Sequence, residues 1–348
     1  EQLVNGRTAF DAMRRGDASA KAVVDGYVHY LCVGITSIVN IFQPEVLCVG
    51  GGISREGEAV MAPVRAYVGK YGYARGSAKQ PRIVAASLAG DAGIIGAALL
   101  AKQIIARGDI GEPVRFRGTF DQGFYNDPNL PWSWRCSKTL GGSGALGDLG
   151  AHTLSVAQFL LGGIREVTAS AQTCLRQRPV PQTDAGYASR VAADAEWREV
   201  ENDDQVQCLV NFDSGAAGVI EASRIAAGRI FGVFWEVSGT EGTLYMDGER
   251  FNELQVYRFN DDKHDRGFKT LYAGSQIPAY AGFFGFDFGG GGLGYFDVKV
   301  IEVHDLVQGI CGEGDCYPNF EFGLQNQRVL SAIEASMASR RWVNVVKD

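Results

Sequence analysis

The sequence lacks the features that mark a chain bound to nucleic acid or set in a membrane. Its 348 residues carry a net charge of −7 and contain no run of Lys and Arg, which a surface for nucleic acid or anionic lipid would need. No apolar run approaches the ~20 residues that span a bilayer, and no signal peptide opens the chain. We therefore expect a cytoplasmic protein that binds neither nucleic acid nor membrane.

A disulfide framework and a metal-binding pattern are missing as well. The seven cysteines are odd in number and scattered, and most lie in apolar stretches such as VLCVGG and VQCLVNF, which is typical of buried, reduced thiols. Cys311 and Cys316 flank GEGD with no histidine beside them, whereas structural zinc sites combine Cys and His at close spacing. We predict neither disulfides nor a metal site.

The chain is long enough for two domains, and apolar residues make up 46 % of it, enough to form a buried core. In the first, a helix with Asp17 as its expected N-cap is predicted by apolar residues at helical spacing, which are Val24, Val28, Leu31, Ile35, Ile38 and Ile41. EVLCVGGG predicts a buried strand that enters a glycine turn, a helix follows over 57–71, RIVAAS predicts a second strand, and a helix over 91–107 closes the segment. This order predicts an α/β layer with parallel strands over residues 1–100.

Three glycines, Gly50, Gly51 and Gly52, follow the first predicted strand and precede a helix. Glycine lets a ligand approach the backbone, and a helix N-terminus favours an anion such as a phosphate. Many strand-to-helix turns use glycine for their geometry alone, so a ligand contact and a plain turn both remain open.

After Pro113 the pattern changes from helical spacing to alternation. VRFRGTFDQ alternates apolar and charged residues, as a half-buried strand does, and QVQCLVNFDSGAAGVIEAS and IFGVFWEVSGTEGTLYMDG each predict a hairpin. NELQVYRF, FKTLYAG and RWVNVV predict further strands, and helices are expected near 296–311 and 320–338. Runs of strands with separate helices predict an α+β domain with a large, open, mainly antiparallel sheet over 101–348.

Residues of catalytic type gather in WSWRCSKTLGGSGALGDLGAHTLSVAQFLLGG. The apolar pattern from Gly144 is helical, so Asp148 and His152, four residues apart, share one helix face. A carboxylate can orient an imidazole and raise its basicity, which a general base needs, although an ordinary surface pair has the same spacing. The glycines around Gly144 favour a site, because they let other segments approach the helix start closely. Arg135 could hold sugar hydroxyls or carboxylates there, or be a solvated charge.

INIFQPEVLCVGGGIS and PRIVAASLAGDAGIIGAALLA, within residues 1 to about 102, resemble the C-terminal end of ROK-family sugar kinases and repressors. The resemblance implies a partial RNase H-like (actin-like) lobe in which Gly50–Gly52 lie beside a nucleotide. The family's phosphate loop, catalytic Asp and zinc motif do not occur in the sequence. Because phosphoryl transfer needs a metal site, phosphate clamps and a positioned acceptor, we do not expect kinase activity.

GDIGEPVRFRG, WRCSKTLGGSGALGDLGAH, WEVSGTEGTLYMD, GLGYFDVKVIEV and RWVNV, within about residues 98–348, resemble the Gfo/Idh/MocA oxidoreductases of sugars and inositols. The resemblance implies that Asp148 and His152 are catalytic, lie near the nicotinamide and help to remove the alcohol proton during hydride transfer. The residues that it places along the sugar pocket are Asp121, Gln122, Trp134, Arg135 and Tyr295, with Asp297 as a further candidate.

The dinucleotide-binding half of that family has no counterpart in the sequence. No Gly-x-Gly-x-x-Gly follows a strand, opens a helix and has an acidic residue about 20 positions on. Glu-Lys-Pro, whose lysine is the family's main proton handler, does not occur either. We therefore expect NAD(P) to bind only if a Rossmann domain is supplied, and no cofactor otherwise.

The two resemblances overlap at about Ala98–Lys102, inside one continuous apolar helix that ends at Gly108. The sequence thus predicts a ROK-like segment over 1–100 fused to a Gfo/Idh/MocA-like substrate and dimerisation domain over 101–348. By descent it is the sugar- or polyol-binding half of an NAD(P)-dependent oxidoreductase, not catalytically complete alone, and a homo-oligomer through its sheet. The alternative is a nucleotide- or sugar-binding module without redox activity.

Overall fold

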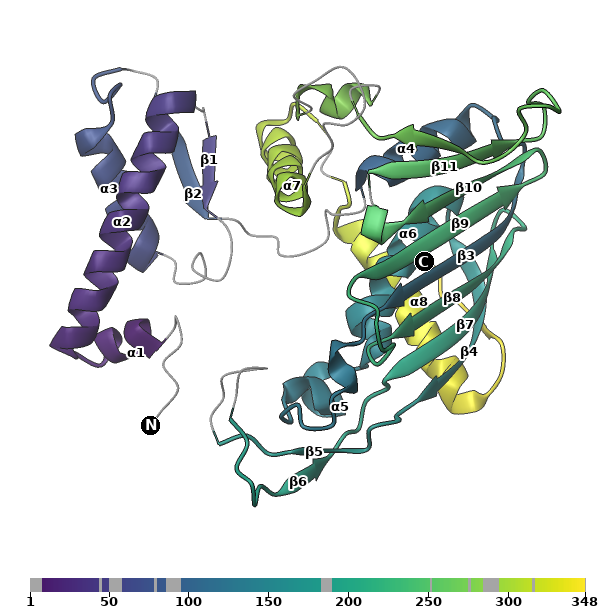
Figure 1. The fold of residues 1–348 in the computed structure, drawn as a ribbon, viewed down its shortest axis with the longest axis horizontal. Coiled ribbons are helices and arrows are strands. Elements are labelled where there is room, and N and C mark those ends of the chain that lie inside the picture. The colour runs from purple at the N-terminus through teal and green to yellow at the C-terminus, as the bar shows by residue number, and fades with distance from the viewer. Residues whose placement is uncertain are drawn as a thin grey trace. The chain divides into compact units, whose positions relative to one another are not determined.

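The structure, a computed structural model, divides the chain into two compact units, Glu1–Gly90 and Asp91–Asp348 (Figure 1). The described residues are 8–43, 46–49, 58–77, 80–85, 95–182, 190–250, 252–274, 277–283, 294–314 and 317–347. The predicted boundary at residue 100 stays a prediction, and each unit is described by itself.

The elements of the first unit are α1 (Thr8–Arg14), α2 (Ala18–Phe42), β1 (Val46–Val49), α3 (Glu58–Tyr71) and β2 (Arg82–Ala85). They follow the predicted order from α2 to β2, whereas α1 was not predicted and the expected closing helix packs in the second unit. The two strands pair in parallel, with Val46 opposite Arg82. Asp17 caps α2 as expected, since its carboxylate accepts a hydrogen bond from the Ala20 N–H at 2.9 Å.

The core of the first unit forms where α2 packs on α3. The residues buried there are Phe10, Val24, Val28, Cys32, Ile35, Val39, Val60, Met61, Val64, Val68 and Ile83. Ile38, which the periodicity places on the apolar stripe, is 47 % exposed, and the buried stripe passes through Cys32 and Val39 instead. Gly50, Gly51 and Gly52 lie outside the described residues.

Among the described residues, one helix is long and apolar enough to cross a membrane. It is Ala18–Asn40 of α2, with a mean hydropathy of 1.5. The expectation that no apolar run approaches the length of a membrane span was therefore wrong, since this helix has the required length and composition. Since the stripe through Val24 and Cys32 packs in the core, and core helices pass the same test, the helix is weak evidence of a membrane span.

The second unit combines one large sheet with helices and short turns of helix. Its helical elements are α4 (Ile95–Ala106), η3 (Phe124–Asn126), η4 (Trp134–Cys136), α5 (Lys138–Gly141), the π-helical η5 (Leu146–Gly150), α6 (Ala151–Leu161), η7 (Gly248–Arg250), η8 (Pro278–Phe283), α7 (Tyr295–Cys311) and α8 (Phe320–Ser339). Its strands are β3 (Pro113–Asp121), β4 (Ile164–Gln172), β5 (Gln177–Pro179), β6 (Trp197–Glu199), β7 (Gln205–Phe212), β8 (Ala217–Ser223), β9 (Gly232–Gly239), β10 (Gly242–Asp247), β11 (Glu253–Arg258), β12 (Lys269–Tyr272) and β13 (Val343–Asn344).

The large sheet has nine strands in the order β12-β11-β10-β9-β3-β8-β7-β4-β13. Both predicted hairpins, β7–β8 and β9–β10, are confirmed as antiparallel pairs. The pairing of β3 with β8 is parallel, which makes the sheet mixed, although it is mostly antiparallel as predicted. The sequence pattern did not reveal β4, nor the separate pair of β5 and β6.

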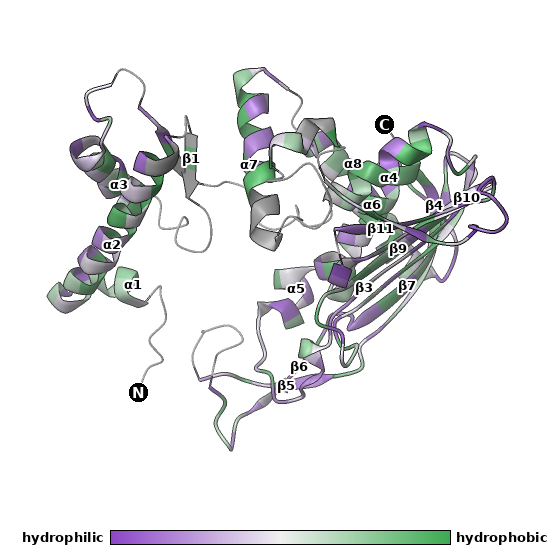
Figure 2. Ribbon diagram, turned by 45° about the horizontal axis from the view of Figure 1, so that its top comes forward, coloured by the Kyte–Doolittle hydropathy of each residue, from purple (hydrophilic) through white to green (hydrophobic). Residues whose placement is uncertain are grey.

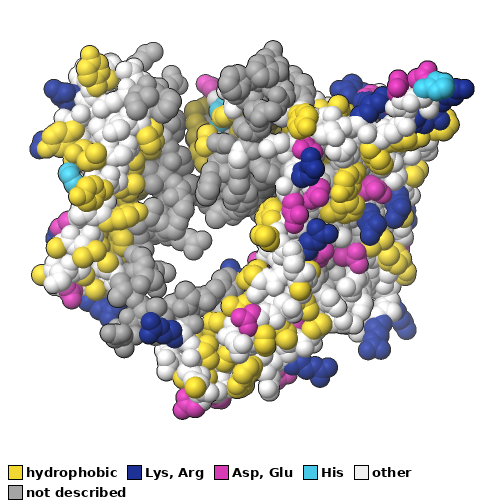
Figure 3. Space-filling model, in the orientation of Figure 1, with side chains coloured by type: hydrophobic (Ala, Val, Ile, Leu, Met, Phe, Trp, Pro, Cys, Tyr) yellow, Lys and Arg dark blue, Asp and Glu magenta, His cyan; other side chains and the backbone are white. Residues whose placement is uncertain are grey.

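Helices α4, α6 and α8 pack on one face of this sheet and carry hydrophobic residues (Figure 2). Alternation along the strands sends residues such as Phe116, Val210 and Trp235 into the core, where they are buried. The other face carries half-buried and exposed residues such as Arg117 and Leu209. In Figure 3, charged side chains of both signs and hydrophobic ones lie over the sheet.

Helix α4 belongs to the second unit by its packing. Ala97, Ala98, Leu100, Ala101 and Ile104 are all buried in the core of the large sheet domain. The helix in which the two family resemblances overlap is therefore an integral part of the second unit.

Five described cysteines are unpaired, and three of them, Cys32, Cys136 and Cys208, are buried. Burial, helped by the charge of Asp203, raises the pKa of Cys208 to about 12. That thiol therefore stays protonated at neutral pH and packs as a small apolar side chain.

Candidate functional site

Asp148 lies within a π-helical turn that runs directly into α6, the helix of His152. The turn is closed by a hydrogen bond from the Ala151 N–H to the Leu146 carbonyl, five residues back. Leu146 and Leu154 are buried in the core, whereas Asp148 is exposed and His152 is half-buried. The predicted helix is confirmed, and its interruption by a π turn is of the kind often found at functional positions.

His152 sits where α6 meets the end of β3. Its ring meets the Phe120 ring edge-on, with 5.6 Å between the centroids. Helix and strand are in close contact here, since a Cβ added to Gly118 would lie 2.6 Å from Thr153 Cγ2. The glycine in β3 thus lets α6 approach the sheet and holds His152 beside the carboxyl end of the strand.

The alternation of β3 places Asp121 on the face of the sheet opposite to the one that His152 packs on, and its assignment to the sugar pocket stays a prediction. Phe120 faces α6, so the next residue, Asp121, points to the opposite face of the sheet. Burial raises the pKa of Asp121, the nearby charge of Glu221 raises it further, and Arg229 partly offsets both. Gln122 continues the chain past the strand and is held through its backbone, which donates to the Ser223 carbonyl.

Trp134 and Arg135 lie in η4, a single 3-10 turn. The Arg135 guanidinium stacks over the Trp134 ring at 4.3 Å, and the indole is 51 % exposed. Gly141 in α5 lies close below, since a Cβ there would be 3.0 Å from the Trp134 carbonyl oxygen. An exposed aromatic face with a cation beside it offers both the apolar surface and the hydrogen-bond donors that a sugar contact uses.

Two further predicted sites cannot be placed at the level of side chains. Tyr295 is the first residue of α7, and Asp297 lies in its first turn, but the side chains of both fall outside the described part of the structure. The same holds for the whole of the Gly50–Gly52 turn. Their assignments stay predictions.

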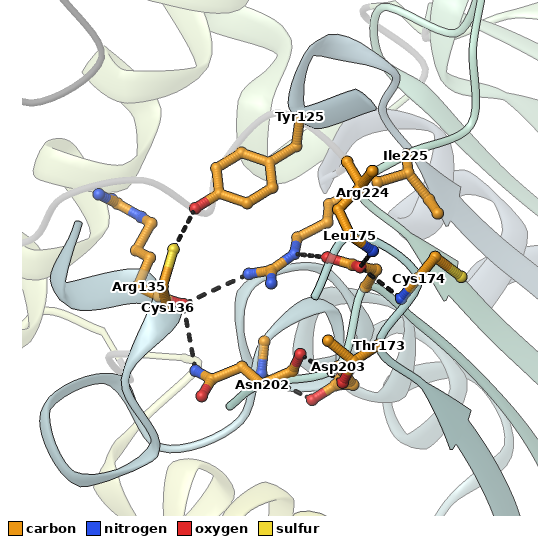
Figure 4. A network of polar contacts seen from close by, with 12 residues as sticks. Tyr125, Arg135, Cys136, Thr173, Cys174, Leu175, Asn202, Asp203, Arg224 and Ile225 are labelled. Atoms are coloured by element: carbon orange, nitrogen blue, oxygen red, sulfur yellow. Dashed lines mark hydrogen bonds and ion pairs between the residues drawn. The ribbon is translucent and has the colours of Figure 1, made fainter. Parts of the chain in front are cut away.

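The sequence pattern did not reveal the segment Glu201–Asp204, which binds several of the elements above. Figure 4 shows its residues Asn202 and Asp203. The Asp203 carboxylate accepts hydrogen bonds from the N–H groups of Gly144, at 2.7 Å, and Leu146, at 2.8 Å. Its backbone carbonyl accepts a third from Ala145 at 2.9 Å. One residue from a distant loop therefore satisfies the amides that start the helix of Asp148 and His152.

The hydrogen bonds of Asp203 also indicate whether the glycines at the helix start could bind a phosphate. Gly142, Gly144 and Gly147 have the Gly-x-Gly-x-x-Gly spacing of a dinucleotide fingerprint. However, they follow helix α5, not a strand, and the Asp203 carboxylate occupies the position that a phosphate would take. These residues do not fit a pyrophosphate, and Gly144 instead allows the close approach of the Asp203 backbone, whose carbonyl oxygen would lie 2.0 Å from an added Cβ.

The next residue, Asp204, forms a buried ion pair with Arg224. The Arg224 Nε lies 2.9 Å from the Asp204 Oδ1, with 5 % and 0 % of the two side chains exposed. The second carboxylate oxygen of Asp204 accepts hydrogen bonds from the N–H groups of Cys174 and Leu175. Arg224 also donates to the Arg135 carbonyl at 3.4 Å, which ties the pair to the η4 turn.

Tyr125 packs beside this pair, between two guanidinium groups. Arg178 lies 3.9 Å and Arg224 4.4 Å from the ring centroid. The phenol oxygen is 3.1 Å from the Cys136 sulfur. Burial, reinforced by this contact with Cys136, raises the pKa of Tyr125, so the phenol stays neutral and the η4 turn is held from beneath.

Two families match successive parts of the chain. Residues 1–104 match the ROK family, and residues 98–245 match the GFO/IDH/MocA C-terminal domain. The levoglucosan dehydrogenase of Pseudarthrobacter phenanthrenivorans is 38 % identical over 250 residues, which cover 72 % of this chain and 64 % of that protein. The glucokinase of Thermotoga maritima is 40 % identical over 105 residues, covering 28 % of this chain and 30 % of that protein.

Solved structures agree with the second match. An NAD binding oxidoreductase from Klebsiella pneumoniae has a TM-score of 0.70 and 75 % identity, covering 90 % of this chain and 83 % of that one. A levoglucosan dehydrogenase in complex with NADH and L-sorbose has a TM-score of 0.66 and 33 % identity, covering 84 % of this chain and 71 % of that one.

These matches define a chain built from parts of two sugar-related families. The chain belongs to the GFO/IDH/MocA oxidoreductases through its larger part, which is fused to a preceding ROK-family segment. It spans 64 % of the curated dehydrogenase and 30 % of the curated glucokinase.

Proposed function

We propose that the second unit binds a sugar or polyol for an NAD(P)-dependent oxidoreductase, with Asp148 and His152 at the reacting hydroxyl. The observation that carries this proposal is the placement of the pair. The exposed carboxylate and the half-buried imidazole stand on consecutive helical turns, at the π turn beside the end of β3. The similarity to a levoglucosan dehydrogenase supports a sugar as the substrate.

In this proposal the chain's own residues bind the sugar and move one proton. Trp134 offers an apolar face to the ring, and Arg135 offers donors to its hydroxyls. Asp148 orients the imidazole, and His152 accepts the proton that leaves the hydroxyl as the alcohol is oxidised. Bound NAD(P) would supply the hydride acceptor. Since the glycines around Gly144 do not fit a pyrophosphate, we infer that another domain must hold it.

A second candidate function is a binding module without redox activity, in which the first unit is a partial actin-like lobe. It is favoured by the absence from the sequence of Glu-Lys-Pro and of a glycine fingerprint in a strand-turn-helix setting. The ROK match over residues 1–104 supports a lobe that would hold a nucleotide at Gly50–Gly52.

We further propose a cytoplasmic homo-oligomer in which a second copy covers the open face of the sheet. Leu209 is exposed on that face, and Asp121 and Arg117 lie on it as well. A patch of apolar residues mixed with charges of both signs is what an interface between copies requires. On this proposal Asp121 lies in the interface between copies and not in the sugar site.

Calorimetry on the purified chain tests these proposals directly. We expect levoglucosan or L-sorbose to bind and NAD+, NADP+ and ATP not to bind at millimolar concentration. His152→Ala should weaken sugar binding, and the chain alone should form no NADH. A measurable NAD-dependent oxidation that His152→Ala abolishes would show instead that the chain is catalytically complete. Binding of ATP alone would favour the second candidate.

A further inference from the structure

Two adjacent residues, Asn202 and Asp203, bind both elements of the proposed sugar site. The Asn202 side-chain amide donates to the Arg135 carbonyl at 3.1 Å, in the turn that carries Trp134. The Asp203 carboxylate and carbonyl accept hydrogen bonds from three successive N–H groups, those of residues 144–146, where the helix of Asp148 and His152 begins. Figure 4 shows the two side chains leaving neighbouring positions of one loop.

The loop and the helix start are in direct backbone contact. A Cβ added to Gly144 would lie 2.0 Å from the Asp203 carbonyl oxygen and 3.1 Å from the Asn202 Cβ. Because real Cβ contacts of 2.0 Å do not occur, only glycine fits here with the backbones at this separation. The helix start therefore has no room to move toward the loop.

The residues on either side fix the loop itself. Before the pair, the Glu201 N–H donates to the Cys136 carbonyl at 2.9 Å, and its carboxylate accepts from the Lys138 N–H at 2.6 Å. After the pair, Asp204 is held by Arg224 and donates its N–H to the Gln172 carbonyl, at the end of β4. The Asn202–Asp203 pair is thus anchored to the sheet on one side and to the η4 turn on the other.

We propose that the Asn202–Asp203 pair is a positioning element that sets the spacing between the Trp134–Arg135 turn and the helix of Asp148 and His152. It would thereby select which sugars fit between them. Adjacent Cα atoms are a fixed ~3.8 Å apart, so the two anchors cannot drift independently. A displacement of about 1 Å in a site of this kind can change rates about a hundredfold. This inference rests on the sugar site proposed above.

The test compares two sugars across variants. Asn202→Ala removes the anchor to Arg135, and Asp203→Glu keeps the carboxylate but lengthens its side chain by one methylene. Asn211→Ala is the matched control, because its amide donates to Glu166 at 3.0 Å, between β7 and β4, and contacts neither site element. Calorimetry gives the Kd of each protein for levoglucosan and for L-sorbose, and the ratio of the two Kd values is the readout.

We expect the ratio to change about fivefold or more in both pair variants and to stay within about twofold in the control, in line with the discrimination that pocket geometry gives. A variant that is merely less stable lowers the folded fraction for both sugars equally and leaves the ratio unchanged. An unchanged ratio in Asn202→Ala and Asp203→Glu would overturn the proposal.

A second readout separates failure of this inference from failure of the proposed function. If the wild-type chain binds neither sugar, the proposed function fails, and hydrogen exchange then decides the positioning role. Asn202→Ala should speed exchange both at Ser137, whose N–H bonds to the Trp134 carbonyl, and at Leu146, whose N–H bonds to Asp203. Faster exchange at Ser137 alone would mean that the two anchors are independent, and would refute the inference.

Discussion

The described residues of the two units form sheets of very different size. The first has a two-stranded parallel sheet with α2 and α3 packed together, and it leaves Tyr27 and Tyr30 of α2 exposed. The second has a nine-stranded sheet with helices on one face. A sheet of two strands is marginal by itself. The comparison teaches that a segment can keep its family's sequence pattern and its local elements with only a small sheet among its described residues.

The largest expected effect comes from cutting the chain at two nearby points. A protein of residues 91–348 keeps all of α4, so we expect its second unit to have the same free energy of unfolding as in the full chain. A protein of residues 101–348 loses Ala97, Ala98 and Leu100 from the core. Deleting buried side chains of this size costs about 2–5 kcal/mol for a leucine alone, so the shorter protein should be at least that much less stable in urea unfolding. Equal stability of the two would place α4 outside the second unit.

The next effect compares an ion pair in each unit. Asp204→Ala leaves Arg224 buried without its carboxylate, which should cost about 3–5 kcal/mol. Asp25→Ala in the first unit breaks the Lys21–Asp25 pair, whose side chains are 62 % and 59 % exposed, and should cost less than about 1 kcal/mol. Urea denaturation of both variants measures the difference. Similar losses would mean that Arg224 finds another partner when Asp204 is removed.

A substitution of one glycine in each unit should also affect stability differently, with smaller changes in the free energy of unfolding. Gly144→Ala drives a Cβ into the Asp203 carbonyl and should destabilise the second unit by about 1–3 kcal/mol, as overpacking does. Gly26 lies inside α2 with no atom within 4 Å of an added Cβ. Gly26→Ala should therefore stabilise the first unit by about 0.5–1 kcal/mol through helix propensity. Thermal unfolding followed by circular dichroism should show the two shifts with opposite signs.

The sequence alone predicted those features of the fold that depend on contacts between residues close together in the chain. The hairpins β7–β8 and β9–β10 show alternation on both sides of a short turn, so their pairing is predictable, and Asp17 is a cap three residues from its partner. Hairpin and cap patterns involve residues only a few positions apart, so they can be recognised without knowing the rest of the fold.

Prediction failed where contacts join distant segments. The parallel pairing of β3 with β8 links residues about a hundred positions apart, and no local pattern encodes it. Asp203, in the run ENDD, looks like part of a solvated turn, yet its partners lie 57 and 59 residues earlier. Ile38 and Val39 are both apolar, and only the packing against α3 decides that Val39 is the buried one.

The smallest effect concerns the open face of the second unit's sheet, where Asp121 points. Burial, with the charge of Glu221 adding to it, holds the folded-state pKa of Asp121 above its unfolded value of about 3.9. The group therefore favours folding when it is protonated, and that stability is present below the unfolded pKa and lost as the pH rises through the folded pKa. Asp121→Asn, which carries no charge to bury, should be more stable than the wild type at pH 7, by about 0.5 kcal/mol.

The stability difference between Asp121→Asn and the wild type should depend on pH. The advantage of Asp121→Asn should vanish near pH 3, where the wild-type carboxyl is also neutral. Asp109 gives the opposite sign, because its hydrogen bond to Arg107, with Arg258 contributing, lowers its pKa, so Asp109→Asn should lose stability at pH 7. Thermal unfolding of both variants between pH 3 and pH 8 measures the two profiles. If a second copy covers the open face, the Asp121→Asn advantage should also grow with protein concentration, since association removes the carboxylate further from water.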